Sequence, residues 1–139
     1  MSLFNFGDYK LSSGKKSNFK INCDKLTDED LDAIAHKVAK AWGDEYIFKR
    51  IEYVPTGGER FAKALANYIK VSPESDYPVL LVDDVFTTGK SMAKAREKLI
   101  AQHEVVEGVV LFARDFRKIS FYFSWIMPVF IMDIEDDVE

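Results

Sequence analysis

The chain has 139 residues, 47% of them hydrophobic and 14% aromatic, which is enough to build about one globular domain without disulfide or metal cross-links. The net charge of -4 argues against a generally basic surface for nucleic acid. The lone cysteine, Cys23, excludes an internal disulfide and indicates a reducing compartment. No signal-like N-terminus is visible, and the most apolar stretch, 121–132, is interrupted by Ser124 and Pro128. We therefore expect a soluble, cytoplasmic protein without membrane or nucleic-acid partners.

The first half of the chain predicts two extended segments followed by alternating helices and strands. Residues 9–24 read as strands around a turn at Ser13-Gly14. Apolar residues then recur at helical spacing over 26–42, where Thr27 is the expected N-cap. Residues 47–55 alternate as a strand, 56–59 form a turn, and 60–70 return to helical spacing.

The second half continues the alternation. Pro73 and Pro78 frame a short loop before 79–85, whose continuous apolar start suits a strand buried on both faces. A helix over 89–102, a strand over 105–113 and a last extended segment over 123–132 follow, and 133–139 is an acidic tail. This order predicts one α/β domain over 1–139, with a mostly parallel sheet between two layers of helices.

The stretch from 79 to 91, VLLVDDVFTTGKS, carries the strongest functional pattern. Ligands of open α/β sheets bind beyond the carboxyl ends of the strands, where we expect Asp83 and Asp84. The following loop and helix start offer backbone N–H groups, hydroxyls and a glycine that permits close approach: Thr87, Thr88, Gly89, Lys90 and Ser91. Such a hollow suits a phosphate, while the carboxylates suit hydroxyl groups or a cation. A ribose phosphate has both kinds of group.

This stretch resembles the signature of the type I phosphoribosyltransferases. The resemblance implies that Asp83 and Asp84 face the ribose hydroxyls of phosphoribosyl pyrophosphate, directly or through Mg²⁺, and that the loop from Thr87 to Ser91 encloses its 5-phosphate. A second strand, turn and helix, EYVPTGGERFAKALA, resembles the pyrophosphate loop of that family. Its candidate residues are Thr56, Gly57, Gly58 and Glu59, with backbone amides as the main donors.

Within that family, the N-terminal segment resembles the orotate phosphoribosyltransferase branch. There, residues matching 1–25 form a hood over the pyrimidine, and Lys15, Lys16, Ser17 and Phe19 fall on the pattern, whereas Lys20 stands where an aromatic is usual. Arg114 resembles the arginine that faces the carboxylated base. A basic surface hairpin and a surface ion pair are the structural alternatives for these residues.

The resemblance implies transfer of ribose 5-phosphate to a nucleobase with release of pyrophosphate, Mg²⁺ as cofactor, and a homodimer. One block of the family is missing. Only KVSPESDYP joins Ile69 to Val79, where orotate enzymes carry a further strand and a mobile basic loop. Loss of that loop predicts reduced turnover, or its replacement by Lys15, Lys16 or another subunit.

Two other functions remain open. The chain could bind phosphoribosyl pyrophosphate or a nucleotide as a regulatory module without turnover. Gly89-Lys90-Ser91 also matches the end of a P-loop, but that pattern needs glycine at position 84, where the chain has Asp.

Overall fold

A parallel four-stranded sheet forms the centre of the protein. The computed structural model describes residues 4–10, 16–116 and 120–132. The sheet has the order β4 (Ile51–Tyr53), β6 (Val79–Phe86), β7 (Val106–Arg114) and β8 (Ile126–Met132), with every neighbouring pair parallel. The predicted acidic tail, 133–139, lies outside the described residues.

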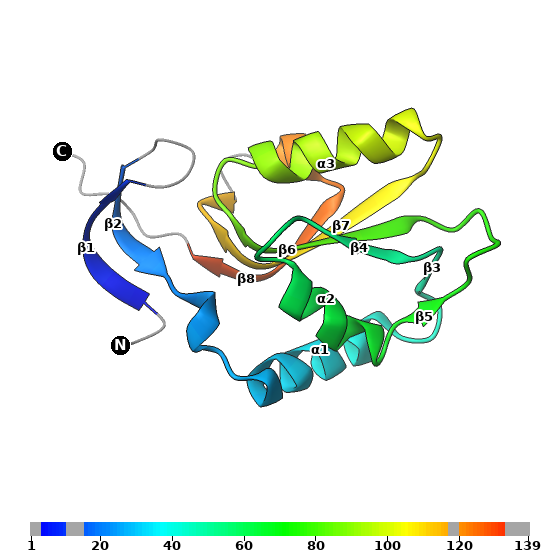
Figure 1. Cartoon of the computed structure of the whole chain (residues 1–139), viewed down its shortest axis with the longest axis horizontal. Helices are drawn as coiled ribbons and strands as arrows, with labels where there is room; N and C mark the ends of the chain where they lie inside the picture. Colours follow the sequence, from blue (N-terminus) through cyan, green and yellow to red (C-terminus); the bar gives the residue numbers. More distant parts are fainter. Residues whose placement is uncertain (1–3, 11–15, 117–119, 133–139) are drawn as a thin grey trace.

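Helices cover both faces of this sheet, which confirms the predicted three-layer α/β fold. Figure 1 shows α1 (Asp28–Trp42) and α2 (Glu59–Ala66) on one side and α3 (Lys90–Ala101) on the other. Leu80 and Val82 of β6 pack in the core cluster that contains α1 and α2 residues, whereas Val79 and Leu81 pack in the cluster that contains Met92 and Leu99 of α3. A strand with side chains buried on both faces needs its continuous apolar sequence.

The start of α1 is fixed by its sequence. The Thr27 side chain accepts a hydrogen bond of 3.0 Å from the Asp30 backbone N–H, and the Asp30 carboxylate accepts one of 2.9 Å from the Thr27 N–H. This capping box confirms Thr27 as the N-cap, and such a cap contributes about 1 kcal/mol.

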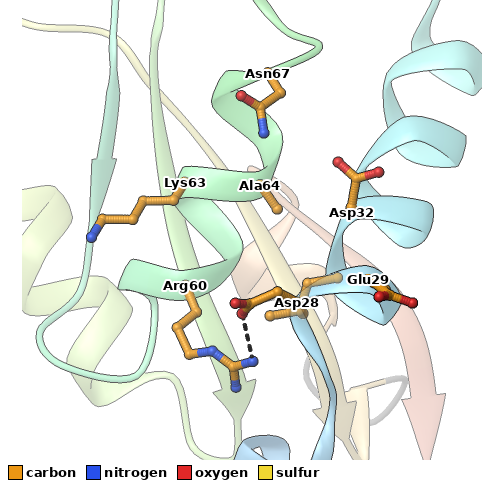
Figure 2. A pocket seen from close by; sticks show the side chains of 8 residues that line it. Asp28, Glu29, Asp32, Arg60, Lys63, Ala64 and Asn67 are labelled. Atoms are coloured by element: carbon orange, nitrogen blue, oxygen red, sulfur yellow. Dashed lines mark hydrogen bonds and ion pairs between the residues drawn. The ribbon is translucent and has the colours of Figure 1, made fainter.

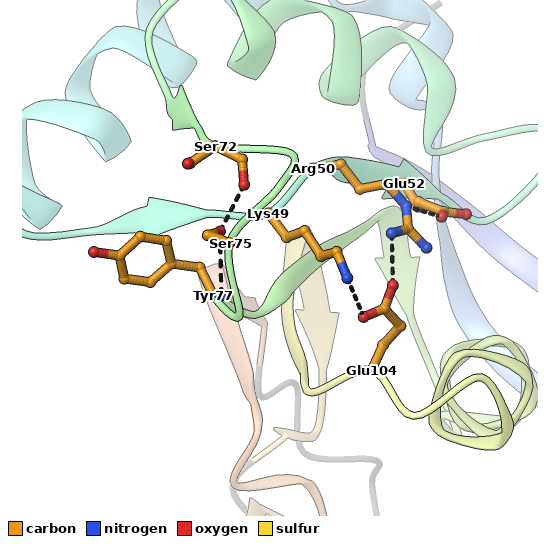
Figure 3. Close-up of polar contacts among 7 residues, drawn as sticks. All are labelled: Lys49, Arg50, Glu52, Ser72, Ser75, Tyr77 and Glu104. Atoms are coloured by element: carbon orange, nitrogen blue, oxygen red, sulfur yellow. Dashed lines mark hydrogen bonds and ion pairs between the residues drawn. The ribbon is translucent and has the colours of Figure 1, made fainter.

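The segment 47–55, predicted as one strand, is divided into β3 (Ile47–Phe48) and β4. Between them, Lys49 and Arg50 both reach Glu104, at 2.8 and 2.7 Å (Figure 3). Successive side chains of a regular strand point to opposite faces, so both cations can meet one carboxylate only where the chain leaves the strand.

The link before β6 keeps a short strand. The helix predicted over 60–70 ends at Ala66, because Lys70 and Val71 form β5, which pairs in parallel with β3. The expectation that the link holds no further strand is therefore wrong, although β5 has only two residues.

An antiparallel hairpin of β1 (Phe4–Lys10) and β2 (Lys16–Ile21) precedes these elements. The two extended segments are as predicted, while the turn at Ser13-Gly14 lies outside the described residues. Figure 1 places the hairpin on the side of the molecule where the strands of the main sheet end. A short 3₁₀ turn, η1 (Cys23–Lys25), joins it to α1.

Candidate functional site

The two aspartates lie within β6, which continues to Phe86, rather than at its end as predicted. The Asp83 side chain is buried, and its Oδ1 accepts a hydrogen bond of 2.8 Å from the Asp84 N–H. Asp84 Oδ1 accepts one of 2.7 Å from the Val85 N–H. Both carboxyl groups are thus oriented by the backbone that follows them, at the carboxyl-terminal half of a central strand.

Burial, together with a hydrogen bond from the Asp84 carboxyl, raises the pKa of Asp83 to about 7. A carboxyl group in this setting is partly protonated near neutral pH, because burial disfavours its ionised form and the neighbouring Asp84 carboxylate adds to the effect. Buried carboxyls with raised pKa values are typical of binding or catalytic sites. The pair can accept hydrogen bonds from hydroxyl groups or contact a cation.

The turn predicted as the second anion loop lies directly against Asp84. A methyl group on Gly57 would come within 2.6 Å of the carboxyl carbon of Asp84, and one on Gly58 would overlap the carbonyl oxygen of Val82. Glycine is therefore required at both positions for the loop to approach β6 this closely. The fold brings together two motifs that are separated by some 25 residues of sequence.

A cavity of about 140 Å³ opens where these motifs meet. Thr56, Gly57 and Asp84 line it. The other lining residues are Cys23, Asp24, Leu31, Arg60, Phe61 and Leu111. Sequence reasoning did not assign Cys23, Asp24 or Arg60 to the site. The position of Arg60, next to the predicted loop, was a signal that could have found it, whereas Cys23 and Asp24 arrive through tertiary folding.

Cys23 is an inert thiol in this cavity. Burial raises its pKa to about 12, with smaller contributions in the same direction from the carboxylates of Asp84, Asp24 and Asp83 and an opposing one from Arg60. A thiol with so high a pKa is not a nucleophile at neutral pH.

The loop from Thr87 to Ser91 has the backbone expected of an anion site. Gly89 adopts φ of 85°, in the left-handed region, and is the N-cap of α3. A side chain there would also overlap the rings of Phe86 and Phe123. Within the described residues, the backbone N–H groups from Thr87 to Ser91 have no protein acceptor. These donors are available to a bound anion.

The loop from Thr56 to Glu59 offers fewer free donors than predicted. The Gly58 N–H donates to the Val54 carbonyl at 3.1 Å and the Glu59 N–H to the Thr56 carbonyl at 3.3 Å. The backbone N–H groups of Thr56 and Gly57 donate to no acceptor in the described part of the chain. The Glu59 side chain meets Lys63, one turn along α2, at 3.5 Å.

The predicted base-binding residues come from different elements of the fold. Lys15 lies outside the described residues, and Lys16 and Phe19 are placed on β2. Arg114 ends β7, is buried, and has its Nε 3.6 Å from the Asp115 carboxylate. Arg114 does not line the cavity beside Asp84. Its role, and that of the hood, stays a prediction.

Two features are absent from the described residues. These residues contain no group of three or more acidic, histidine or cysteine side chains arranged to hold a metal ion. No helix in this part of the chain is both long and apolar enough to span a membrane.

Comparisons with solved structures define the class of protein. The Leishmania donovani UMP synthase structure matches at 27% identity with a TM-score of 0.74, covering 93% of this chain and 33% of that one. Orotate phosphoribosyltransferase from Aeropyrum pernix matches at 27% identity and a TM-score of 0.72, covering 93% and 88%. Adenine phosphoribosyltransferase from Leishmania tarentolae, at 15% identity and a TM-score of 0.66, covers 83% and 77% and shares the fold. No family model and no curated protein matches the sequence.

The fold and its neighbours are those of the type I phosphoribosyltransferases, which confirms the resemblance predicted from the sequence. Orotate phosphoribosyltransferases are among the neighbours with the highest similarity shown here. The chain spans about a third of the UMP synthase that it matches.

Proposed function

We propose that the protein transfers the ribose 5-phosphate group of phosphoribosyl pyrophosphate to a nucleobase and releases pyrophosphate. The observation that carries the proposal is the contact between Asp84 and Gly57, which brings a loop with free amides beside the acidic pair. A second loop with free amides, from Thr87 to Ser91, follows the pair along the chain. Backbone N–H groups before and after the carboxylate pair can donate to phosphates, and the carboxylates can accept from hydroxyls, which suits a sugar that is phosphorylated at both ends. Several neighbours are named as phosphoribosyltransferases, which supports this reaction class.

In the proposed reaction, a nitrogen of the base forms a bond to C1 of the ribose as the bond from C1 to the pyrophosphate oxygen breaks. The electron pair of that bond leaves with pyrophosphate, and the proton of the base nitrogen goes to solvent. Positive charge grows on the sugar ring, so the carboxyl groups of Asp83 and Asp84 stabilise it and hold the hydroxyls. The amides of Thr56 and Gly57 donate to the leaving group. No protein nucleophile is needed.

The donor set fits Mg²⁺ in a supporting role. Mg²⁺ is commonly bound by one or two carboxylates together with substrate phosphates, rather than by an all-protein cage. Asp83 and Asp84 provide such carboxylates, and the described residues contain no larger acidic cluster arranged around an ion. Bound Mg²⁺ would neutralise charge on the diphosphate, and the two aspartates would contact it through the ribose hydroxyls or water.

The missing mobile loop favours a second candidate, a module that binds phosphoribosyl pyrophosphate or a nucleotide without turnover. Between β5 and β6 the chain makes a tight turn, in which Ser75 Oγ donates to the Ser72 carbonyl at 2.6 Å and accepts from the Tyr77 N–H at 3.3 Å (Figure 3). A self-bonded turn of this length cannot extend over the cavity, so exclusion of water must come from elsewhere.

Calorimetric titration with phosphoribosyl pyrophosphate and Mg²⁺, followed by turnover assays with a panel of bases, tests the proposal. We expect micromolar binding and pyrophosphate release that requires both base and Mg²⁺. Binding without release for any base would select the regulatory module. Absence of binding, with hydrolysis of ATP, would replace both by the P-loop alternative.

The finer parts of the proposal each have their own measurement. Orotate as the base is tested by the same panel, with uracil as the neutral comparison. The single domain over 1–139, with 1–25 as hood, is tested by removing 1–25, which should abolish base discrimination before sugar-phosphate binding. A homodimer is tested by light scattering, and a cytoplasmic location by fractionation.

A further inference from the structure

Arg60 carries the positive charge of the cavity beside Asp84. Among the described residues that line this cavity, it is the one cation, and Asp24 and Asp84 are the acids. Arg60 also lines a larger groove of about 680 Å³ between α1 and α2, so its side chain stands between the two hollows. Figure 2 shows the groove side, with Arg60 directed toward Asp28.

One edge of the Arg60 guanidinium donates hydrogen bonds to the segment between β2 and α1, residues Asn22–Leu26. Its Nη2 donates to the Leu26 carbonyl at 2.7 Å and to the Asp28 carboxylate at 3.0 Å, and Nη1 makes a longer contact of 3.5 Å with the Cys23 carbonyl. Asp28 is almost fully exposed, so this ion pair is weak. Two backbone carbonyls and one carboxylate thus fix the orientation of the side chain.

The rest of the Arg60 guanidinium has N–H donors without a protein acceptor in the described residues. A guanidinium has five N–H donors, and its planar fork matches two oxygens of a phosphate. In the described part of the chain, Nε and one N–H of Nη1 have no protein acceptor. The same arginine is two residues past Gly58, in the first turn of the helix that follows the Thr56-Gly57 loop. Its free donors therefore lie beside the loop with two free amides.

We propose that Arg60 binds the diphosphate end of the sugar ligand and supplies there a fixed positive charge that the short link before β6 does not provide. This inference rests on the proposed function and deepens it by assigning a ligand-binding residue. Because Asp24 and Asp84 line the same cavity, a bare diphosphate would be repelled. The ligand is expected to enter with Mg²⁺, whose charge would offset that of the two carboxylates.

The test compares Arg60→Gln with Lys63→Gln, using magnesium pyrophosphate and ribose 5-phosphate as separate probes in calorimetry. Gln at position 60 keeps a polar side chain with N–H donors but has no charge. Lys63 is on the same helix and lines the groove but not the cavity, which makes it a matched control. We expect Arg60→Gln to weaken pyrophosphate binding about tenfold or more and ribose 5-phosphate binding less than about twofold. Lys63→Gln should change neither by more than about twofold.

Each outcome decides the inference. Unchanged pyrophosphate affinity in Arg60→Gln overturns it, as does an equal loss for both probes, which would mean that Arg60 acts through the fold alone. If Arg60→Gln does not fold, Arg60→Met replaces it, because methionine keeps an apolar stem without the charge, and the criterion is again a loss confined to pyrophosphate. A wild-type protein that binds neither probe refutes the proposed function, whereas binding of both with an unaffected variant refutes the role of Arg60 alone.

Discussion

The two ends of the parallel sheet use the same kinds of charged residue in opposite ways. At the amino end, Lys49 and Arg50 meet the two oxygens of Glu104, and Arg50 also donates to Glu52 at 2.6 Å (Figure 3). At the carboxyl end, Asp83 and Asp84 lie beside each other and beside Gly57, with the cation Arg60 fastened elsewhere.

The difference separates a structural charge cluster from a site. Opposite charges in direct contact satisfy each other, and the hydrogen bonds from Lys49 and Arg50 hold the pKa of Glu104 below its usual value. Burial raises the pKa of Asp83, and the neighbouring Asp84 carboxyl group raises it as well. A protein gains nothing in stability from such a pair, so a ligand that completes its hydrogen bonds is the better explanation.

Removing the acidic pair should have the largest effect on binding. Asp83→Asn with Asp84→Asn keeps the shape of the pair and removes its negative charge, and a hydrogen bond from a ligand hydroxyl to a charged carboxylate contributes about 1.5–3 kcal/mol. We expect affinity for phosphoribosyl pyrophosphate to fall about 100-fold or more, measured by calorimetry, with turnover falling in parallel.

The fold of this double variant should survive, because Asn avoids the cost of a buried charge. Circular dichroism and thermal melting check this point. A folded double variant with wild-type affinity would refute the assignment of the acidic pair to the ligand.

Gly57→Ala should have the next largest effect. The added methyl would overlap the Asp84 carboxyl group, so either the loop or the aspartate must move. We expect about tenfold weaker binding and a loss of about 1–3 kcal/mol in the free energy of unfolding. Chemical denaturation and calorimetry measure the two quantities. Gly43→Ala is the control, because Gly43 has positive φ but no atom near its Cβ position, so it should lose stability without losing affinity.

Much of this comparison could be predicted from the sequence. The continuous apolar run before Asp83 identified a central strand, Thr27 identified the start of α1, and the loop from Thr87 identified the start of α3. These are local patterns, in which the spacing of residues along the chain determines the structure. Both candidate loops were found for the same reason.

What could not be predicted depends on tertiary contacts. The bend at Lys49 and Arg50 requires Glu104, which lies more than fifty residues away. The close approach of Gly57 to Asp84, and the arrival of Cys23 and Asp24 in the cavity, require the packed sheet. The burial of Arg114 beside Asp115 likewise has no local signal.

The raised pKa of Asp83 predicts how stability changes with pH. The folded-state value of about 7 lies above the ordinary value of 3.8, so this group's contribution is complete below about pH 3.8 and is lost as the pH rises through 7. The loss is at most about 1.4 kcal/mol for each pH unit in that interval. Denaturant unfolding at pH 5 and pH 8 should show a smaller difference for Asp83→Asn than for the wild type. An equal difference in both proteins would show that Asp83 is ionised throughout.

Glu104→Gln should leave ligand affinity unchanged and lower stability, because it removes the carboxylate that holds Lys49 and Arg50 at the amino end of the sheet. The lowered pKa of Glu104 means that its contribution is present above its ordinary pKa of 4.5 and is lost as the pH falls. Thermal melting at pH 7 should therefore show a lower Tm for Glu104→Gln, and the difference should shrink in acid. Glu107→Gln, at an exposed position of β7, is the matched control and should change little. If Glu104→Gln weakened phosphoribosyl pyrophosphate binding as much as the aspartate variants, the two ends of the sheet would not be separable into a structural cluster and a site.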